Sequence, residues 1–422
     1  MAAGPRASSV RHRVLALAVV VYLITYMDRV CIANAAPAIR QEFGFDTVTM
    51  GWIFSAFSWS YALFQIPGGW LGDRFGPRRV LATMVVWWSA FTAATALAWN
   101  ARSMAGFRLL FGLGEAGAFP TATRALSHWL PATERGFAQG ITHAGSRLGA
   151  TLTPPIVVFL TMRFGWRSVF YLFGLAGVVW AAAWYAYYRD HPQQHGGVNA
   201  AELAVIGHPA NSPQAIGPAI RVPWGKILGS RNLRVLCGMY FCYAYCLWMY
   251  LTWFPTYLLE ARQFSLKEMG LFASAPLAAA TLGDAVGGWL SDVLARRFGT
   301  LRWARRSVGI LGFLVMAACV LPATVTHDRY LSIALTTVAL FGLELTVGVS
   351  WAVALDVGAG FAGSVSGVMN MWGNLGGALS PILVAYLVKF YHWQAPFVVA
   401  FGLCLLGAIC YLRIDPDDRI VA

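Results

Sequence analysis

A repeated six-residue segment limits the folds that are open to this chain. Residues 68–73 read Gly-Gly-Trp-Leu-Gly-Asp, and 219 residues later residues 287–292 read Gly-Gly-Trp-Leu-Ser-Asp. Each copy ends a long apolar run and is followed by arginines, so the duplicated unit is about half of the 422-residue chain. A duplicated half built from apolar helices, with a ligand site between the two halves, is typical of secondary transporters.

Apolar stretches long enough to cross a bilayer occur along the whole chain. Only 12% of the residues are charged and 58% are hydrophobic, whereas roughly 25% of a soluble domain is charged. Lipid accepts helices of about 20 apolar residues. Twelve stretches reach this length: residues 14–36, 51–71, 79–99, 103–126, 136–160, 166–188, 234–258, 268–292, 307–326, 330–354, 363–388 and 394–413. They predict an all-α membrane protein with twelve transmembrane helices in two pseudo-symmetric six-helix bundles.

One long polar stretch divides these twelve segments into six and six. Residues 189–233 contain several Pro and Gly residues and little apolar periodicity, which indicates a linker. We therefore expect an N-terminal bundle over residues 1–188, a cytoplasmic linker over residues 189–233 and a C-terminal bundle over residues 234–422. Within the linker, residues 224–228 are expected to form a short amphipathic helix at the membrane surface.

The basic residues are distributed unevenly between the two sides of this arrangement. With a cytoplasmic N-terminus, the segments on that side hold 20 of the 31 Lys and Arg residues, the opposite loops hold 8, and 3 lie inside predicted helices. This excess is the positive-inside pattern, and it predicts a multi-pass protein of the cell (inner or plasma) membrane with both termini in the cytoplasm. The net charge of +13 therefore orients the chain and does not indicate nucleic-acid binding. The first stretch is too long for a signal peptide core and is expected to remain as a helix.

Several ionisable residues lie inside the predicted helices, where each costs several kcal/mol and is a functional candidate by default. The planar guanidinium of an arginine matches a carboxylate, and a carboxyl group shielded from water binds a proton more readily than an exposed one. The residues of this kind in the first half are Asp28, Arg29, Arg108, Glu115 and Arg147, with Tyr61 beside them in the second stretch. They predict the joint transport of an organic anion and protons.

Structural ion pairing is the alternative for these charges, and Arg147 in particular could pair with Glu115 or with a carbonyl group. In the second half, Glu344 and Asp284 are expected to be structural because both lie toward the cytoplasmic ends of their predicted helices.

A glycine and arginine motif follows the second apolar stretch. It consists of Gly69, Asp73, Arg74, Gly76, Arg78 and Arg79, and Asp292 and Arg296 repeat part of it in the second half. Glycines let helix ends approach closely, and the charged groups can pair at the cytoplasmic face. This spacing resembles the loop signature of the major facilitator superfamily, which implies a role in gating.

Four further segments resemble the anion:cation symporter family within that superfamily: residues 27–33, 108–116, 165–170 and 253–258. The resemblance covers residues 10–415 and implies import of sugar acids such as hexuronates, galactonate or glucarate. It also implies site roles. Proton coupling falls to Asp28 and Glu115, and binding of the anionic substrate falls to Arg29, Arg108, the cavity tyrosine Tyr61, and Asn370 with Asn374 one turn apart. Helix–helix hydrogen bonding is an equally good account of the two asparagines.

One position departs from the family pattern. Several sugar-acid members carry a glutamine on the fifth helix, and the best match here is Ser146, followed by Arg147. A shorter polar group beside a third arginine leads to the hypothesis of a substrate with two carboxylates, such as an aldarate or tartrate.

Other classes of function have less support in the sequence. Cys242 and Cys246 are one turn apart but lack a histidine cluster, and no phosphate-binding loop or hydrolytic grouping is present. We therefore expect no metal, no cofactor and no enzymatic activity. The expected partners are a small anion, protons and the lipid bilayer, and the chain is expected to act as a monomer. A proton-independent anion uniporter or exchanger, and a membrane sensor that transports nothing, remain as alternatives.

Overall fold

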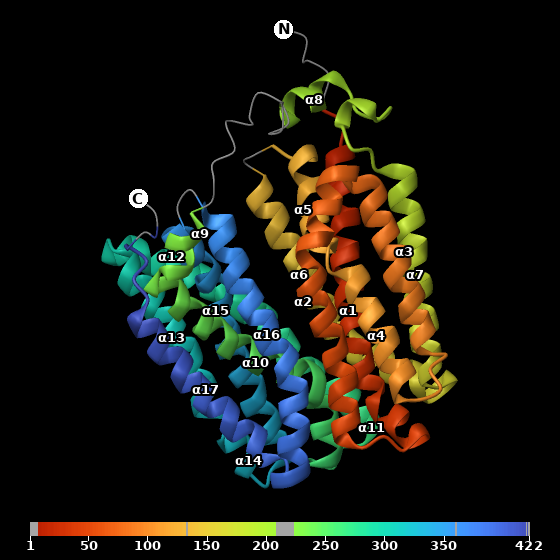
Figure 1. The fold of residues 1–422 in the computed structure, drawn as a ribbon, viewed down its shortest axis with the longest axis vertical. Helices are drawn as coiled ribbons and strands as arrows, with labels where there is room; N and C mark the ends of the chain where they lie inside the picture. Colours follow the sequence, from red (N-terminus) through yellow and green to blue (C-terminus); the bar gives the residue numbers. More distant parts are fainter. Residues whose placement is uncertain (1–6, 132–133, 208–222, 359–360, 419, 421–422) are drawn as a thin grey trace. The chain divides into compact units, whose positions relative to one another are not determined.

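The computed structural model describes residues 7–131, 134–207, 223–358, 361–418 and 420. Within these ranges the regular elements are helices, and no strand is present (Figure 1). The first half contains α1 (Val10–Phe43), α2 (Thr47–Phe75), α3 (Pro77–Thr95), α4 (Ala101–Glu115), α5 (Ala118–Trp129), α6 (Arg135–Phe164) and α7 (Trp166–Tyr187). The linker contains a 3-10 turn η1 (Pro192–Gln194), α8 (Ala200–Ile206) and α9 (Trp224–Gly229). The second half contains α10 (Arg231–Glu260), α11 (Leu266–Phe272), α12 (Ser274–Phe298), α13 (Leu301–Val320), α14 (Pro322–Val325), α15 (Arg329–Gly358), α16 (Ala362–Tyr391) and α17 (Gln394–Arg413).

The prediction of an all-helical chain with twelve apolar segments is confirmed. Nine of the segments are single helices in the described residues, and three are split into the pairs α4 and α5, α11 and α12, and α13 and α14. The last split has a local cause, because Pro322 opens α14 and cannot donate a backbone hydrogen bond to the preceding turn. The predicted linker helix at residues 224–228 corresponds to α9.

Eight segments of the described chain are long and apolar enough to cross a membrane on length and composition alone. The four that fall short of this are α2, α3, α4 with α5, and α6, all in the first half. Three of the intramembrane charges lie on these segments, Arg108 and Glu115 on α4 and Arg147 on α6, while Asp28 and Arg29 lie on α1. The helices α4 and α5 fall short because they have only 15 and 12 residues.

The chain forms two compact units. Unit 1 comprises residues 1–31, 60–150 and 163–220, and unit 2 comprises residues 32–59, 151–162 and 221–422. The end of α1, the beginning of α2 and a short part of α6 therefore belong to unit 2.

In unit 1, α3 packs against α7, α4 and α5, and α6 lies close against α1. Gly149 of α6 faces the backbone of Leu23, and a β-carbon at this position would clash with the Leu23 carbonyl oxygen. The linker is also attached to this unit, where α8 lies across the end at which α1 begins (Figure 1). Glu202 of α8 accepts hydrogen bonds from the amides of Val10 (3.2 Å) and Arg11 (2.9 Å). It thereby satisfies two of the backbone donors that are left open at the start of a helix.

In unit 2, α10 packs against α16 and α17, and α15 packs against α12 and α13. The residues 32–59 are held against α10 and α16 by polar contacts. Arg40 forms an ion pair with Glu260, and Lys389 Nζ lies 3.3 Å from Asp46 Oδ2. The Ser55 hydroxyl donates to the Ala378 carbonyl over 2.5 Å.

Candidate functional site

A buried ion pair is the centre of the candidate site in unit 1. Arg29 of α1 donates through Nε to Glu115 Oε1 at the end of α4. The Glu115 side chain is fully buried and that of Arg29 is 9% exposed. The two residues are 86 positions apart in the chain, so only the packing of α1 against α4 brings them together.

Asp28, the neighbour of Arg29, has a different partner. The indole Nε1 of Trp88 on α3 donates to Asp28 Oδ2 over 3.1 Å, and Asp28 is fully buried. In both carboxyl groups one oxygen is bonded and the other has no hydrogen-bond partner among the described residues, namely Asp28 Oδ1 and Glu115 Oε2. Each buried carboxyl group therefore has one oxygen at which a proton or a ligand donor could bind.

Arg108 completes the group of charges. It is 1% exposed, lies two turns before Glu115 on α4, and interacts electrostatically with Asp28 and Glu115. Its guanidinium carbon lies 4.3 Å from the centre of the Phe111 ring. The structure thus brings four predicted residues, Asp28, Arg29, Arg108 and Glu115, into one buried cluster, which we call the charge cluster.

Aromatic rings surround the guanidinium of Arg29. Its carbon lies 4.5 Å from the ring centre of Tyr61, 5.0 Å from Tyr26 and 5.2 Å from Phe119. Such contacts stabilise a buried cation, each by about 1–2 kcal/mol where water is excluded. Tyr61 was predicted to belong to the site, and it does contact Arg29.

Three residues near the charge cluster were not expected from the sequence. Trp88 and Phe119 lie in apolar runs and give no local signal of a polar role. His143 of α6 lies edge-on to Tyr22, with ring centres 5.8 Å apart, and Tyr22 in turn lies 4.4 Å from Phe119. The position of His143 beside the aromatic rings around Arg29 depends on the packing of α1, α5 and α6, so the sequence alone does not predict it.

The two site residues predicted on α6 are Ser146 and Arg147. Ser146 is buried, and its hydroxyl donates to the Thr142 carbonyl of its own helix over 3.5 Å. Arg147 is half-buried on the same helix. Both belong to unit 1, like the charge cluster. The ion-pair partner of Glu115 in the structure is Arg29.

The predicted site residues of unit 2 are uncharged, unlike those of the charge cluster. Asn370 and Asn374 are half-buried on α16, on either side of Gly373, where a β-carbon would meet the ring of Tyr240. Between residues 235 and 261, and again between residues 330 and 388, the sequence contains no lysine, arginine or histidine. Away from their first turns, the helices α10, α15 and α16 of this unit therefore carry hydroxyl, amide and aromatic groups and no guanidinium groups.

Glu344 differs from the sequence-based expectation. It lies in the middle of α15, not toward its end, and it is fully buried. The hydroxyl of Tyr243 on α10 donates to Glu344 Oε1 over 3.0 Å, and the Tyr243 ring stacks on Tyr240. The depth expected for Glu344 was wrong because α15 continues to Gly358, beyond the end of the predicted stretch at residue 354.

The glycine and arginine motif of unit 1 forms a network at the end of α2. Asp73 forms an ion pair with Arg124 of α5, and a β-carbon at Gly72 would lie 2.5 Å from the Thr121 hydroxyl oxygen. The backbone amide of Arg78 donates to Asp190 Oδ1 over 2.9 Å. Gly76 has a φ of +83°, which a residue with a side chain rarely adopts.

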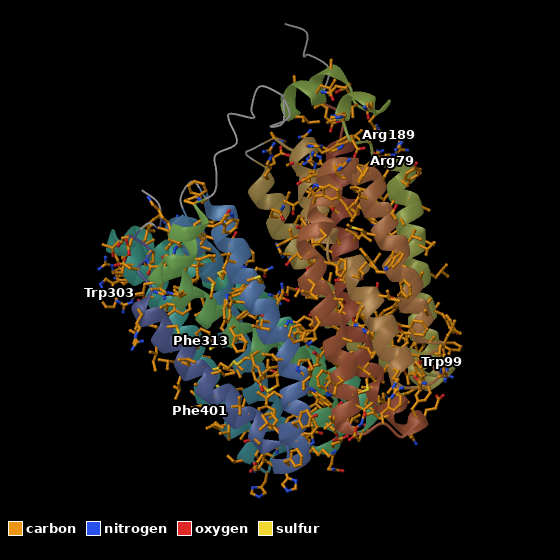
Figure 2. The ribbon with its side chains drawn as sticks, in the orientation of Figure 1. Arg79, Trp99, Arg189, Trp303, Phe313 and Phe401 are labelled. Carbon is orange, nitrogen blue, oxygen red and sulfur yellow. The ribbon has the colours of Figure 1, made fainter. Side chains whose placement is uncertain are left out.

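The other motif residues of unit 1 lie around this network. Gly69 faces Pro120 of α5, Arg74 lies over the rings of Trp70 and Phe75, and Arg79 is exposed. Figure 2 places Arg79 and Arg189 at the same end of unit 1 and Trp99 at the opposite end.

In unit 2 the repeated motif uses a different partner. Arg305 of α13 lies 2.9 Å from Asp292 Oδ1 and 3.3 Å from Asp356 Oδ2 of α15, so one arginine joins two carboxylates. Arg296 is exposed in the last turn of α12. The sequence repeat therefore predicts the aspartate of the network but not the arginine that pairs with it.

The chemistry of the charge cluster is limited to binding and proton exchange. Its groups are guanidinium, carboxyl and aromatic side chains, which suit an anion and protons. In the described part of the chain, no group of three or more His, Cys, Asp and Glu side chains is positioned to hold a metal ion.

The chain is similar to known membrane transporters over most of its length. The model of the Major Facilitator Superfamily matches residues 18–381 and 302–421. A probable sulfoacetate transporter of Cupriavidus necator is 40% identical over 408 residues, which cover 96% of this chain and 94% of that protein. A D-galactonate transporter of Escherichia coli is 31% identical over 420 residues, with 97% of each chain covered.

A solved structure has the same fold. It is a bacterial homolog of the human lysosomal transporter Spinster, in an inward-facing and occupied conformation. The TM-score is 0.79 at 18% sequence identity, over 97% of this chain and 98% of that chain. At this identity the likeness concerns the fold alone.

Proposed function

Because the chain belongs to the major facilitator superfamily, we propose that it imports a small organic anion together with protons. Membership of this superfamily makes the chain a multi-pass membrane transporter and not an enzyme. The observation that carries the proposal is the charge cluster of unit 1, in which two buried carboxyl groups lie among two buried arginines.

The proposed cycle begins with protonation of Asp28 and Glu115 from outside the cell. A protonated Glu115 no longer offers a negative partner to Arg29, so the guanidinium becomes available to a carboxylate or sulfonate of the substrate. The oxygens Asp28 Oδ1 and Glu115 Oε2, which have no hydrogen-bond partner among the described residues, are the places at which these protons would bind. After the anion and the protons leave on the inside, Arg29 and Glu115 pair again and reset the carrier.

The cycle requires alternating access, which we attribute to a rocking movement of the two halves of the chain, residues 1–188 and 234–422. The excess of basic residues on one side supports an orientation in a cell membrane with both termini in the cytoplasm. Asn370 and Asn374 would serve the substrate from the second half, and the motif residues Asp73, Arg78 and Asp292 would help to hold the closed cytoplasmic side.

For the cargo, we propose a small anion with two acidic groups. The relatives support a small acid, since their names include transporters of sulfoacetate and D-galactonate. Sulfoacetate carries a sulfonate and a carboxylate. Arg147, a third intramembrane arginine beside Arg29 and Arg108, supports a substrate with a second negative group. An Arg147→Ala variant that prefers monocarboxylates and dianions as the wild type does would contradict this part of the proposal.

The test is uptake into proteoliposomes with an imposed proton gradient. The labelled panel contains sulfoacetate, galactonate, glucarate and a hexuronate. We expect gradient-driven accumulation of one acid by the wild-type protein, and loss of accumulation in Glu115→Gln. Asp284→Asn is the matched control, because it neutralises an intramembrane carboxyl group of unit 2 outside the charge cluster.

Other outcomes would change the assignment. Equilibration of an acid without regard to the gradient would indicate a uniporter or an exchanger. Full accumulation by Glu115→Gln would contradict the proton-coupling role of this residue. If folded protein takes up none of the acids, the assignment of an organic anion fails, and a ligand sensor becomes the better hypothesis.

A further inference from the structure

A groove on unit 1 lies apart from the charge cluster, between α1 and α7. Its volume is about 380 Å³. It is lined by Arg13, Ala16, Leu17 and Val20 of α1 and by Ala183 and Tyr187 of α7. The α1 residues are spaced as one face of a helix, and at a rise of 1.5 Å per residue they extend over about 10 Å. The groove therefore follows the direction of the helices.

The two ends of this groove differ in chemistry. Away from the start of α1 the lining is apolar and open, with Val20 at 42% exposure. At the other end lie Arg13 and the hydroxyl group of Tyr187. This hydroxyl oxygen is buried and has no hydrogen-bond partner among the described residues. A buried polar group without a partner is destabilising, so an acceptor oxygen of a ligand at this place would be stabilising.

More positive charge surrounds the polar end. The ring of His195 lies edge-on to Tyr187, with ring centres 4.9 Å apart. Burial lowers the pKa of His195, and the guanidinium groups of Arg189 and Arg13 lower it further. The histidine is therefore neutral at neutral pH, and the positive charge here belongs to the two arginines. Figure 2 shows Arg189 at the end of unit 1 across which α8 lies.

We propose that this groove binds an anionic phospholipid. Its phosphodiester group would accept hydrogen bonds from Arg13 and from Tyr187, and one acyl chain would lie against Leu17, Val20 and Ala183. A phosphate at the boundary between an arginine pair and an apolar groove is the arrangement in which basic pockets between transmembrane helices bind acidic headgroups. A zwitterionic lipid suits the site less, because its ammonium group would face the same arginines. The inference does not depend on the transported cargo.

Thermal unfolding of the purified full-length protein in detergent tests this site. Dioleoyl phosphatidylglycerol, dioleoyl phosphatidylcholine and inorganic phosphate are added separately. We expect phosphatidylglycerol to raise the midpoint of the wild-type protein by several degrees, and the other two to change it little. Arg13→Gln should remove the response to phosphatidylglycerol. Arg297→Gln, an exposed arginine in the last turn of α12, is the matched control and should keep the response.

A second variant covers a failure of Arg13→Gln to fold. Tyr187→Phe keeps the ring but removes the hydroxyl, and loss of one hydrogen bond of about 1 kcal/mol lowers affinity about fivefold, as measured by native mass spectrometry of the phosphatidylglycerol complex. Equal stabilisation by phosphatidylcholine would contradict selectivity for an anionic headgroup and would make the groove a general lipid contact. Stabilisation by phosphate alone would make it a simple anion site. An undiminished response in both variants would overturn the proposal.

Discussion

Each carboxyl group of the charge cluster has one oxygen fixed by a protein donor and one oxygen that no described residue bonds. This asymmetry matters for a residue that must gain and lose a proton without moving far. The fixed oxygen holds the side chain in place, and the other oxygen changes its protonation. The sequence identifies Asp28 and Glu115 as intramembrane acids, but it cannot identify Trp88 or Arg29 as their partners, since both contacts depend on packing between distant helices.

At this scale we expect Trp88→Phe to impair transport although it is a change between two apolar aromatic residues. It removes the donor to Asp28 Oδ2 and leaves a buried acceptor unsatisfied, at a cost of about 1–3 kcal/mol. Uptake should fall about tenfold or more, and the unfolding midpoint should drop by several degrees. Trp99→Phe, at an exposed position of the same unit, should change neither, and equal effects of the two variants would contradict the role of Trp88.

At the scale of elements, close helix contacts determine where the helices break and how they approach. The sequence predicts the twelve apolar segments because hydropathy along one helix is enough to define them. It does not predict the break between α4 and α5, where Gly117 lies against the backbone of Gly68 on α2. It also predicts the repeated motif aspartates but not their different partners, Arg124 in unit 1 and Arg305 in unit 2.

The contact between α6 and α1 gives a sharp prediction for two glycines of one helix. A β-carbon at Gly149 would clash with the backbone of Leu23, whereas nothing lies within 4 Å of a β-carbon at Gly140. We expect Gly149→Ala to be destabilising by about 1–3 kcal/mol through overpacking, visible as a lower unfolding midpoint. Gly140→Ala should be neutral or slightly stabilising, because alanine is the better helix former. A destabilised Gly140→Ala variant would mean that helix α6 tolerates no added methyl group anywhere.

At the scale of the whole molecule, unit 2 includes the end of α1 and the beginning of α2, held to α10 and α16 by exposed ion pairs. If the halves rock as proposed, these contacts break and re-form in every cycle. Exposed ion pairs contribute only about 0–1 kcal/mol each, which suits contacts that must open readily. The Thr49 hydroxyl and amide, which donate to Asp46, hold the pKa of this carboxyl group below its usual range.

A lowered pKa means that Asp46 remains ionised until the pH falls well into the acid range, so its pair with Lys389 persists at neutral and mildly acidic pH. We therefore expect Lys389→Gln to change uptake by less than about fivefold and to leave the pH dependence of transport unaltered. Lys389→Glu, which places two carboxylates together, should have the larger effect, reduced by added salt. Uptake at two salt concentrations and several pH values measures both, and a wild-type rate for Lys389→Glu at low salt would show that the pair is not remade during transport.

The distribution of charge between the halves has a consequence for how such carriers diversify. The arginines and acids of the charge cluster lie on helices of the first half, while α10, α15 and α16 offer tyrosines and asparagines, and Glu344 with its Tyr243 partner. Under the proposed function, point mutations in the second half can alter which uncharged part of the cargo is accepted, without disturbing the acids that exchange protons. A duplicated ancestral gene would thus have kept proton exchange and recognition of the anionic groups in one copy and left the hydroxyl groups of the cargo to the other. Selection for a new carbon source could then act on the second copy while the first stayed under constraint.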